Sequence, residues 1–294
     1  MLNKEHLHEE MLRTVNKSIK GEQFIRNYYK FPIGLFVLND MQSADEMYNH
    51  VMNEIPDRES REFDTYYDCW LYLYTKLSNN PMSKFHYEII LKNKIASTGF
   101  SAVSTRNPEL RATAISMICA SFEKDTKIVN EAANFIARLH LLNKGQGNFY
   151  FMTNKDNNLI KNFPIEHERT HVFKTKKARP MLYSFSLAII ALINVYKQTE
   201  LPKYLKLASE YANFIIQNDF KNDYCGKSLV AMCMMYEVTK QKKYMQMADS
   251  LNQYIGQLTI RDNFHTHDGK LISVDRLSEY AIGMECYDRV IART

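Results

Sequence analysis

The stretch that decides the fold is residues 191–217, ALINVYKQTELPKYLKLASEYANFIIQ, which aligns without a gap on residues 231–257, AMCMMYEVTKQKKYMQMADSLNQYIGQ. A shorter third copy, NEAANFIA at residues 130–137, matches SEYANFII at residues 209–216. In each long copy, apolar residues recur at i, i+3, i+4 and i+7 on both sides of a short polar break, which is the spacing of two amphipathic helices. The sequence therefore predicts a series of helical hairpins.

The same periodicity extends along the whole chain and predicts twelve helices of two alternating types. The first type has one face rich in Lys, Glu and Gln and is expected at 4–20, 42–55, 84–95, 126–142, 203–217 and 241–257. The second type is apolar on most of its circumference and is expected at 23–38, 62–77, 109–122, 181–197, 227–239 and 275–291. A helix that is apolar all round must be buried on all sides. Six such helices inside six amphipathic ones predict an all-α, (α/α)6 toroid.

Composition and linkers fit one helical domain. The 294 residues include only 9 Gly and 7 Pro, fewer than a Gly-rich nucleotide-binding fold or a β-sandwich would need for its turns. No Pro, Gly or Ser-rich linker interrupts the helices, so we predict a single domain over residues 1–294. The main alternative is an open superhelical array of the same hairpins, which would expose a concave face instead of enclosing a cavity.

The net charge, the cysteines and the N-terminal sequence give expectations about binding partners and cellular location. The net charge of +5 is modest for this length and does not predict nucleic-acid binding. The charged start MLNKEHLHEE lacks the apolar core of a signal peptide, and no apolar run is long enough to span a membrane. Five scattered cysteines without a CxxC pair suit reduced thiols. We therefore expect a cytoplasmic protein, while the oligomeric state stays open.

The hairpins resemble two known groups of toroid proteins. Residues 181–257 are similar to the hairpins of six-hairpin glycosidases and sugar epimerases. In residues 91–151, the elements LKNKIASTGF (91–100) and LNKGQGNF (142–149) resemble the end of an outer helix in terpenoid cyclases and protein prenyltransferases. Both resemblances imply the same double ring of helices. They support the fold more than a reaction, because one fold hosts many activities.

In such a ring, the segments that lead into the inner helices open on one end of the central cavity, where helix N-termini favour anions. These segments are 56–64, 99–111, 160–183, 218–228 and 261–277. Residues 161–180, KNFPIEHERTHVFKTKKARP, have six basic and two acidic side chains and so carry most of the net charge. Lys174 and Arg179 in this segment, with Lys227, predict a site for a small anionic ligand.

His167 and His171 form an HExxH pattern inside this basic segment. On a helix the pattern can hold zinc, but here it lies between Pro164 and Pro180 and is polar on every face. We therefore favour one of these histidines as an acid/base group rather than a metal ligand.

A second part of the sequence contains an alternative candidate for a zinc site. Asp223 and Cys225, at the start of an inner helix, with His265 or His267, resemble the zinc ligands of protein prenyltransferase β-subunits. That family places its histidine on the last inner helix, and here residues 275–291 contain none. No cofactor is therefore favoured, and zinc remains the alternative.

The inner helix at 62–77 combines carboxylates with aromatic rings. Asp64 and Asp68 are one helical turn apart, and Tyr67 and Trp70 lie on the same helix. Burial among rings would raise the pKa of a carboxyl group and suit it to act as a general acid. Aromatic rings also stack on the apolar faces of sugars. Asp64 alternatively caps the helix, with the aromatic side chains in the core.

The sequence thus predicts an enzyme that acts on a small anionic substrate, best an acidic sugar or oligosaccharide, as a hydrolase, lyase or epimerase. Asp64 or Asp68 would be the acid/base group and His167 or His171 its partner. Tyr183 or Tyr224 would donate a proton, and Lys174, Arg179 and Lys227 would hold the anion near Tyr67 and Trp70. One alternative is an enzyme of the terpenoid cyclase or prenyltransferase type that binds an isoprenoid diphosphate. Another is a non-catalytic helical array that binds a partner protein.

Overall fold

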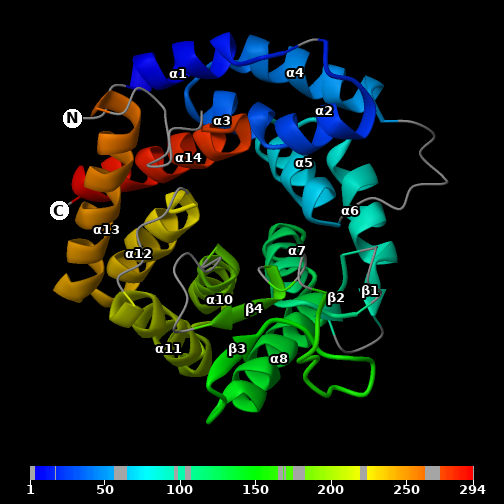
Figure 1. The fold of residues 1–294 in the computed structure, drawn as a ribbon, viewed down its shortest axis with the longest axis vertical. Helices are drawn as coiled ribbons and strands as arrows, with labels where there is room; N and C mark the ends of the chain where they lie inside the picture. Colours follow the sequence, from blue (N-terminus) through cyan, green and yellow to red (C-terminus); the bar gives the residue numbers. More distant parts are fainter. Residues whose placement is uncertain are drawn as a thin grey trace.

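The fold is known from a computed structural model, which describes residues 4–16, 18–55, 65–95, 99–102, 107–164, 168, 170–174, 183–218, 224–261 and 272–293. Helices dominate these segments and are arranged in two concentric layers around a common centre (Figure 1). The outer helices are α1 (Lys4–Arg13), α4 (Met41–Asn53), α6 (Ser83–Lys92), α8 (Thr126–Asn143), α11 (Pro202–Asn218) and α13 (Lys242–Gly256). The inner helices are α3 (Phe31–Val37), α5 (Thr65–Leu77), α7 (Leu110–Phe122), α10 (Tyr183–Thr199), α12 (Gly226–Thr239) and α14 (Val274–Ile291).

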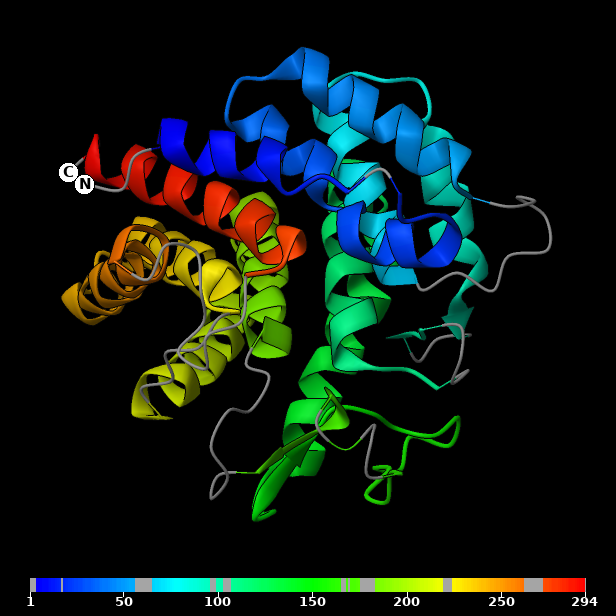
Figure 2. The ribbon, with the colours of Figure 1, turned by 45° about the horizontal axis from the view of Figure 1, so that its top comes forward.

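The inner helices form a closed ring. Each packs on the next in chain order, and α14 packs on α3, so the last inner helix meets the first. Helix α1 runs beside α14 in both ribbon views, which brings the two ends of the chain to the same side (Figures 1 and 2). The (α/α)6 toroid predicted from the sequence is confirmed, and the open array is excluded.

The repeat encodes the turns that connect inner to outer helices. In the hairpins α10–α11 and α12–α13, Thr199 and Thr239 donate to the carbonyl groups four residues earlier, and the next residues, Glu200 and Lys240, have a left-handed backbone with φ of 55°. The same left-handed position recurs before the other outer helices at Asn39, Asn79 and Lys124. One residue with positive φ ends the inner helix and turns the chain back along it.

The two helix types differ in burial as their sequences predict. Most side chains of α7 and α10 are buried, because each of these helices contacts an outer helix and two inner neighbours. The outer helices bury one face only. In the repeat this face contains Tyr204 and Ala208 of α11 and the equivalent Tyr244 and Ala248 of α13. Within the described residues, no helix has the length and apolar character needed to cross a membrane.

Four details differ from the predicted elements. The first outer helix ends at Arg13 instead of continuing to residue 20. The inner segment 23–38 is divided into α2 (Gly21–Tyr28) and α3, with Pro32 in the first turn of α3, where a missing N–H group is tolerated. Two small antiparallel sheets of two strands each were also not predicted. Strand β1 (Lys94–Ile95) pairs with β2 (Gly99–Phe100), and β3 (Asn148–Tyr150) pairs with β4 (Val172–Lys174). The last difference is η1 (Gln257–Arg261), a π-helix that extends α13.

Candidate active site

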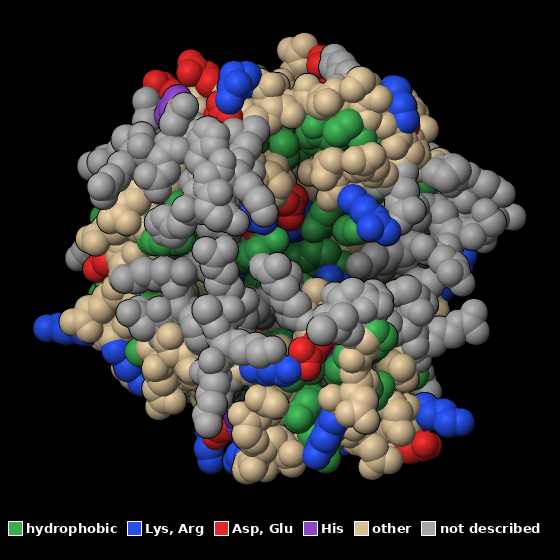
Figure 3. Space-filling view, viewed as in Figure 1, with side chains coloured by type: hydrophobic (Ala, Val, Ile, Leu, Met, Phe, Trp, Pro, Cys, Tyr) green, Lys and Arg blue, Asp and Glu red, His purple; other side chains and the backbone are tan. Residues whose placement is uncertain are grey.

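The charged side chains at the centre of the ring come from one end of the inner helices. Lys30 precedes α3, Tyr66 is in the first turn of α5, and Arg111 is in the first turn of α7. Tyr183 begins α10, Lys227 is in the first turn of α12, and Asp275, Arg276 and Glu279 lie in the first two turns of α14. The space-filling view shows a hollow at this place, where acidic, basic and hydrophobic side chains lie together (Figure 3). The described ends of the predicted segments 99–111, 160–183, 218–228 and 261–277 thus meet at one place, whereas segment 56–64 lies outside the described residues.

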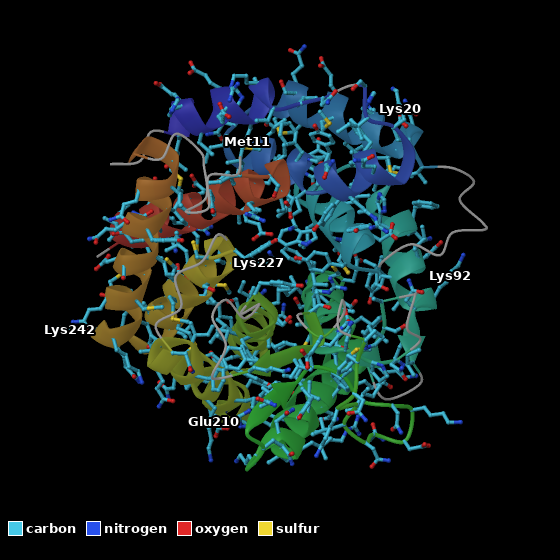
Figure 4. The ribbon with its side chains drawn as sticks, viewed as in Figure 1. Met11, Lys20, Lys92, Glu210, Lys227 and Lys242 are labelled. Carbon is cyan, nitrogen blue, oxygen red and sulfur yellow. The ribbon has the colours of Figure 1, made fainter. Side chains whose placement is uncertain are left out.

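A lysine–carboxylate cluster of Lys30, Lys227, Asp275 and Glu279 occupies one side of this centre. The ammonium groups of Lys30 and Lys227 both contact Oε1 of Glu279. Lys30 also donates to Oδ2 of Asp275 at 3.1 Å, whereas Ser273 donates to the other oxygen of Asp275. Lys30, Lys227 and Glu279 are at most 4% exposed. Of the residues labelled in Figure 4, Lys227 lies nearest the centre of the ring.

Close packing of helices brings the two lysines onto one carboxylate. A Cβ atom on Gly226 would lie 2.6 Å from the backbone oxygen of Glu279, so α12 approaches α14 at a distance that only glycine allows. On the other side of α14, a Cβ atom on Gly34 of α3 would lie 2.8 Å from Cβ of Ser278. These two contacts place Lys227 and Lys30 on opposite sides of Glu279.

The two lysines have different electrostatic surroundings. Burial lowers the pKa of Lys227 to about 8, because the attraction of Glu279 only partly offsets the loss of water and the repulsion of Lys30. Burial acts on Lys30 in the same direction, but Glu279, Tyr29, Tyr66 and Asp275 outweigh it and raise its pKa well above the usual value. Lys227 is therefore the cation whose charge the protein compensates less completely.

A second group, the Glu109 group, consists of Glu109, Arg111 and His171. Nε of Arg111 donates to Oε1 of the buried Glu109 at 3.0 Å, and Nδ1 of His171 lies 3.8 Å from Oε2. The backbone fixes this arrangement, since N–H of Phe151 donates to the carbonyl of His171 at 2.9 Å and N–H of Leu110 donates to the carbonyl of Phe151. A carboxylate next to an imidazole can accept and donate a proton near neutral pH.

Aromatic rings line the space between the two groups. The ammonium of Lys227 lies 5.1 Å from the ring centre of Tyr183 and 5.9 Å from that of Trp70, and the guanidinium of Arg111 lies 4.9 Å from that of Tyr66. Burial raises the pKa of Tyr183, a change that the positive charges of Arg111 and Lys30 oppose and the negative charge of Glu109 reinforces. Tyr183 is thus within electrostatic reach of both groups.

Several residues predicted from the sequence lie in this site. They are Trp70, His171, Tyr183, Tyr224 and Lys227. Tyr224 accepts a hydrogen bond from Arg276 at 2.9 Å, and its ring centre lies 6.1 Å from that of Tyr183. Tyr67 is adjacent, with its ring centre 4.4 Å from that of Tyr29.

Other predicted residues lie elsewhere in the structure. Asp68 is fully buried and its Oδ1 lies 3.2 Å from Nδ1 of His86 on the outer helix α6. Because Tyr66 and Trp70 face the centre, the residue midway between them on α5 faces outward. The structure thus places Asp68, predicted as a catalytic acid, on the outward side of α5, and we assign it to the packing of α5 on α6. Lys174 on β4 forms an ion pair with Glu168.

Cys225 is buried at the residue preceding α12. Within the described residues, no group of three His, Cys, Asp or Glu side chains is placed to hold a metal ion. The remaining predicted site residues lie outside the described residues. They are Asp64, His167, Arg179, Asp223, His265 and His267.

Three important residues were not predicted as site residues, namely Lys30, Glu109 and Glu279. Lys30 lies in the otherwise apolar stretch YYKFPIGLFVL (28–38), and Glu279 lies in the second turn of an inner helix. A single charge in a segment that must be buried is itself a signal for a functional or paired group. That signal could have identified Lys30, but not Glu279, because residues 274–291 contain five other charged side chains.

Comparisons with known proteins agree with this architecture. A Listeria innocua protein, Lin0763, has a TM-score of 0.66 at 12% identity, covering 99% of this chain and 97% of that one. The GH76A α-1,6-mannanase of Salegentibacter sp. HEL1_6 has a TM-score of 0.64 at 12% identity, covering 98% of each chain. An unsaturated glucuronyl hydrolase specific for heparin has a TM-score of 0.64 at 8% identity, covering 99% of this chain and 96% of that one. At these identities the likeness shows the fold. No curated protein matches the sequence.

A family model identifies the class of enzyme. The model of the β-L-arabinofuranosidase GH127 catalytic domain matches residues 66–270, which is more than half of the chain. The matched segment includes Trp70, Glu109, Arg111, Tyr183 and Lys227 and therefore much of the central site. The chain belongs to this GH127 catalytic-domain family, and the protein is a carbohydrate-active enzyme.

Proposed function

We propose that the enzyme cleaves or rearranges an acidic sugar or oligosaccharide that is bound at the centre of the ring. The observation that carries this proposal is the position of Lys227, a buried cation that shares the carboxylate of Glu279 with Lys30. A carboxylate or phosphate on the sugar would add a further negative charge beside Lys227. Arg111, beside Tyr66 and Tyr183, would supply a second cation from the other side of the site.

The proposed chemistry is proton transfer by side chains. Glu109 and His171 are the acid/base pair, with Arg111 holding one oxygen of Glu109 in place. Tyr183 would donate its hydroxyl proton in a hydrogen bond to the substrate, since burial raises its pKa and keeps its hydroxyl protonated. Asp275 would remain an anion, because Lys30 and Ser273 outweigh the effect of burial and lower its pKa. An anion at this position can stabilise positive charge that develops on a sugar ring as its glycosidic bond breaks.

Turnover of a panel of sugars tests the proposal. The panel contains nitrophenyl glycosides of hexuronic acids and the matched neutral hexosides, with wild type and Lys227→Met. We expect turnover of an acidic glycoside, and a larger loss for Lys227→Met on acidic than on neutral substrates. Equal effects of Lys227→Met on both kinds of substrate would contradict the proposed anion site.

A neutral furanoside is the second candidate substrate. The observation that favours it is the family match itself, because the name of that family specifies β-L-arabinofuranosides. The lysine–carboxylate cluster argues for a different substrate, since Lys30, Asp275 and Glu279 lie outside the matched residues 66–270. Nitrophenyl β-L-arabinofuranoside in the same panel separates the two candidates. An isoprenoid diphosphate, the ligand of the alternative toroid enzymes, fits the carbohydrate-active family less well.

A further inference from the structure

Within the described residues, the buried polar atoms of the central site without a hydrogen-bond partner include Nε1 of Trp70, on α5, and Oε2 of Glu279, on α14. Trp70 is 6% exposed and Glu279 is 1% exposed. A buried donor or acceptor without a partner is costly, and such atoms in a binding site mark positions that a ligand satisfies.

The arrangement of the lysines explains why Oε2 of Glu279 is left over. Both ammonium groups contact the same oxygen, Oε1, so the second oxygen of the carboxylate receives no donor. The contact of Gly226 with the backbone of Glu279 fixes α12 against this residue and restricts its adjustment.

The surroundings of Trp70 explain why its N–H group has no hydrogen-bond acceptor among the described residues. The ammonium groups of Lys30 and Lys227 lie 5.6 Å and 5.9 Å from the ring centre of the indole. A protonated lysine has no acceptor atom and cannot pair with the indole N–H. The phenol ring of Tyr66 packs at a steep angle against the indole, with ring centres 6.1 Å apart, and restrains its orientation.

The same two lysines contact Glu279 and flank Trp70, so the unsatisfied acceptor and donor lie beside the same pair of ammonium groups. A hydroxyl group can donate to a carboxylate and accept from an indole N–H, whereas a carboxylate or phosphate oxygen has no proton to donate to Glu279. We propose that Trp70 and Glu279 form a subsite that recognises the hydroxyl groups of the sugar. One hydroxyl donates to Oε2, and the same or the adjacent hydroxyl accepts from Nε1–H.

This subsite gives the bound sugar an orientation, and in that respect it rests on the proposed function. The hydroxylated edge lies against α5 and α14, and the anionic group lies toward Lys227 and Arg111. A sugar that lacks a recognised hydroxyl would leave at least one of the two atoms buried and unpaired. We therefore expect its affinity to fall by about 10- to 100-fold.

Binding of deoxy sugars to matched variants tests the subsite. Trp70 is the single tryptophan of the chain, so its fluorescence reports directly on the occupied site, and calorimetry serves for variants without it. The ligands are glucuronate and its monodeoxy analogues. The variant Trp70→Phe keeps an aromatic ring but removes the N–H group. Tyr72→Phe is the control, because it removes a hydroxyl that donates to Glu123, on the outward side of the same helix.

For wild type and Tyr72→Phe, we expect one deoxy analogue to bind about 10- to 100-fold more weakly than glucuronate. In Trp70→Phe, the ratio of the affinity for glucuronate to that for the deoxy analogue should be at least about fivefold smaller, chiefly because glucuronate binds more weakly. An unchanged ratio in Trp70→Phe would overturn the subsite, even where Lys227→Met still weakens binding and so supports the proposed function. Absence of any sugar binding to wild type at saturating concentrations would overturn both. Circular dichroism establishes that each variant is folded.

Discussion

The two charged groups of the central site are built differently. In the lysine–carboxylate cluster, three helices converge on Glu279, and the lysines are almost completely shielded from water. In the Glu109 group, strand pairing and backbone hydrogen bonds position His171, whose side chain is 12% exposed. A group locked by helix packing suits binding, whereas a histidine beside the cavity can exchange protons with a substrate. The difference suggests that one side of the site holds the sugar and the other side performs the chemistry.

The largest expected effect follows from removing the proposed proton-transfer group. His171→Gln should reduce kcat on the substrate identified by the glycoside panel by about 10²- to 10⁴-fold. The substitution should leave the affinity for sugar nearly unchanged, because the lysine–carboxylate cluster remains intact. Steady-state kinetics and calorimetry measure the two effects separately.

His140→Gln is the matched control for this experiment. His140 also pairs with a glutamate, since its Nε2 lies 2.6 Å from Oε2 of Glu210, but this pair connects the outer helices α8 and α11. A similar loss of kcat in both variants would mean that His171 acts on the fold and not on the reaction.

The next largest effect concerns stability and belongs to the opposite side of the site. Glu279→Ala leaves two buried ammonium groups next to each other and should lower the free energy of unfolding by about 3–5 kcal/mol. Urea denaturation measures the change. Glu285→Ala on the same helix removes a partly exposed partner of Lys4 and should cost less than about 1 kcal/mol. Equal costs for the two substitutions would refute the special role of Glu279.

A smaller loss is expected from disturbing the contact between α12 and α14. Gly226→Ala places a methyl group 2.6–2.8 Å from atoms of Glu279, so one helix must move. Overpacking of this kind costs about 1–3 kcal/mol of unfolding free energy. Gly147→Ala is the control, because no atom lies within 4 Å of the added carbon. If Gly226→Ala and Gly147→Ala both unfold at the same urea concentration as wild type, the close approach of α12 and α14 does not require glycine at position 226.

The sequence predicts the fold well because the fold depends on local periodicity. The duplicated segments 191–217 and 231–257 carry the spacing of each hairpin and also the Thr199 and Thr239 positions at which the inner helices end. Inner helices are recognisable from their apolar circumference alone. The break before α3 was missed, although Pro32 is visible in the sequence, because the apolar pattern continues across it.

The site was predicted less completely because it depends on contacts between distant segments. Lys30 and Glu279 are 249 positions apart, and only ring closure through α14 and α3 brings them together. Conversely, Asp68 lies beside aromatic residues in the sequence but faces the outer layer, because a shift of two residues along a helix reverses the direction of a side chain. Residue type and spacing thus indicated the end of the ring that carries the site, but not the partners within it.

The smallest expected effect is a pH dependence that distinguishes the two lysines. The pKa of Lys227 is lowered to about 8 in the folded protein, while a lysine in the unfolded chain keeps an ordinary pKa near 10.4. Between these values the unfolded chain binds the extra proton, so the contribution of Lys227 to stability should increase with pH, by at most about 1.4 kcal/mol per unit. The facing Asp275, whose pKa is lowered mainly by Lys30 and Ser273, stays ionised in this range. The raised pKa values of Lys30 and Tyr183 act in the opposite sense only near pH 10 and above.

Urea denaturation from pH 8 to 10 measures this dependence. The free energy of unfolding should increase more steeply in wild type than in Lys227→Met, and Lys203→Met on the exposed face of α11 should behave like wild type. Saturating glucuronate should flatten the wild-type slope, because a bound anion keeps Lys227 protonated, whereas glucose should not. Identical slopes in wild type and Lys227→Met would remove the electrostatic distinction between the two lysines and, with it, the reason to place the anion at Lys227.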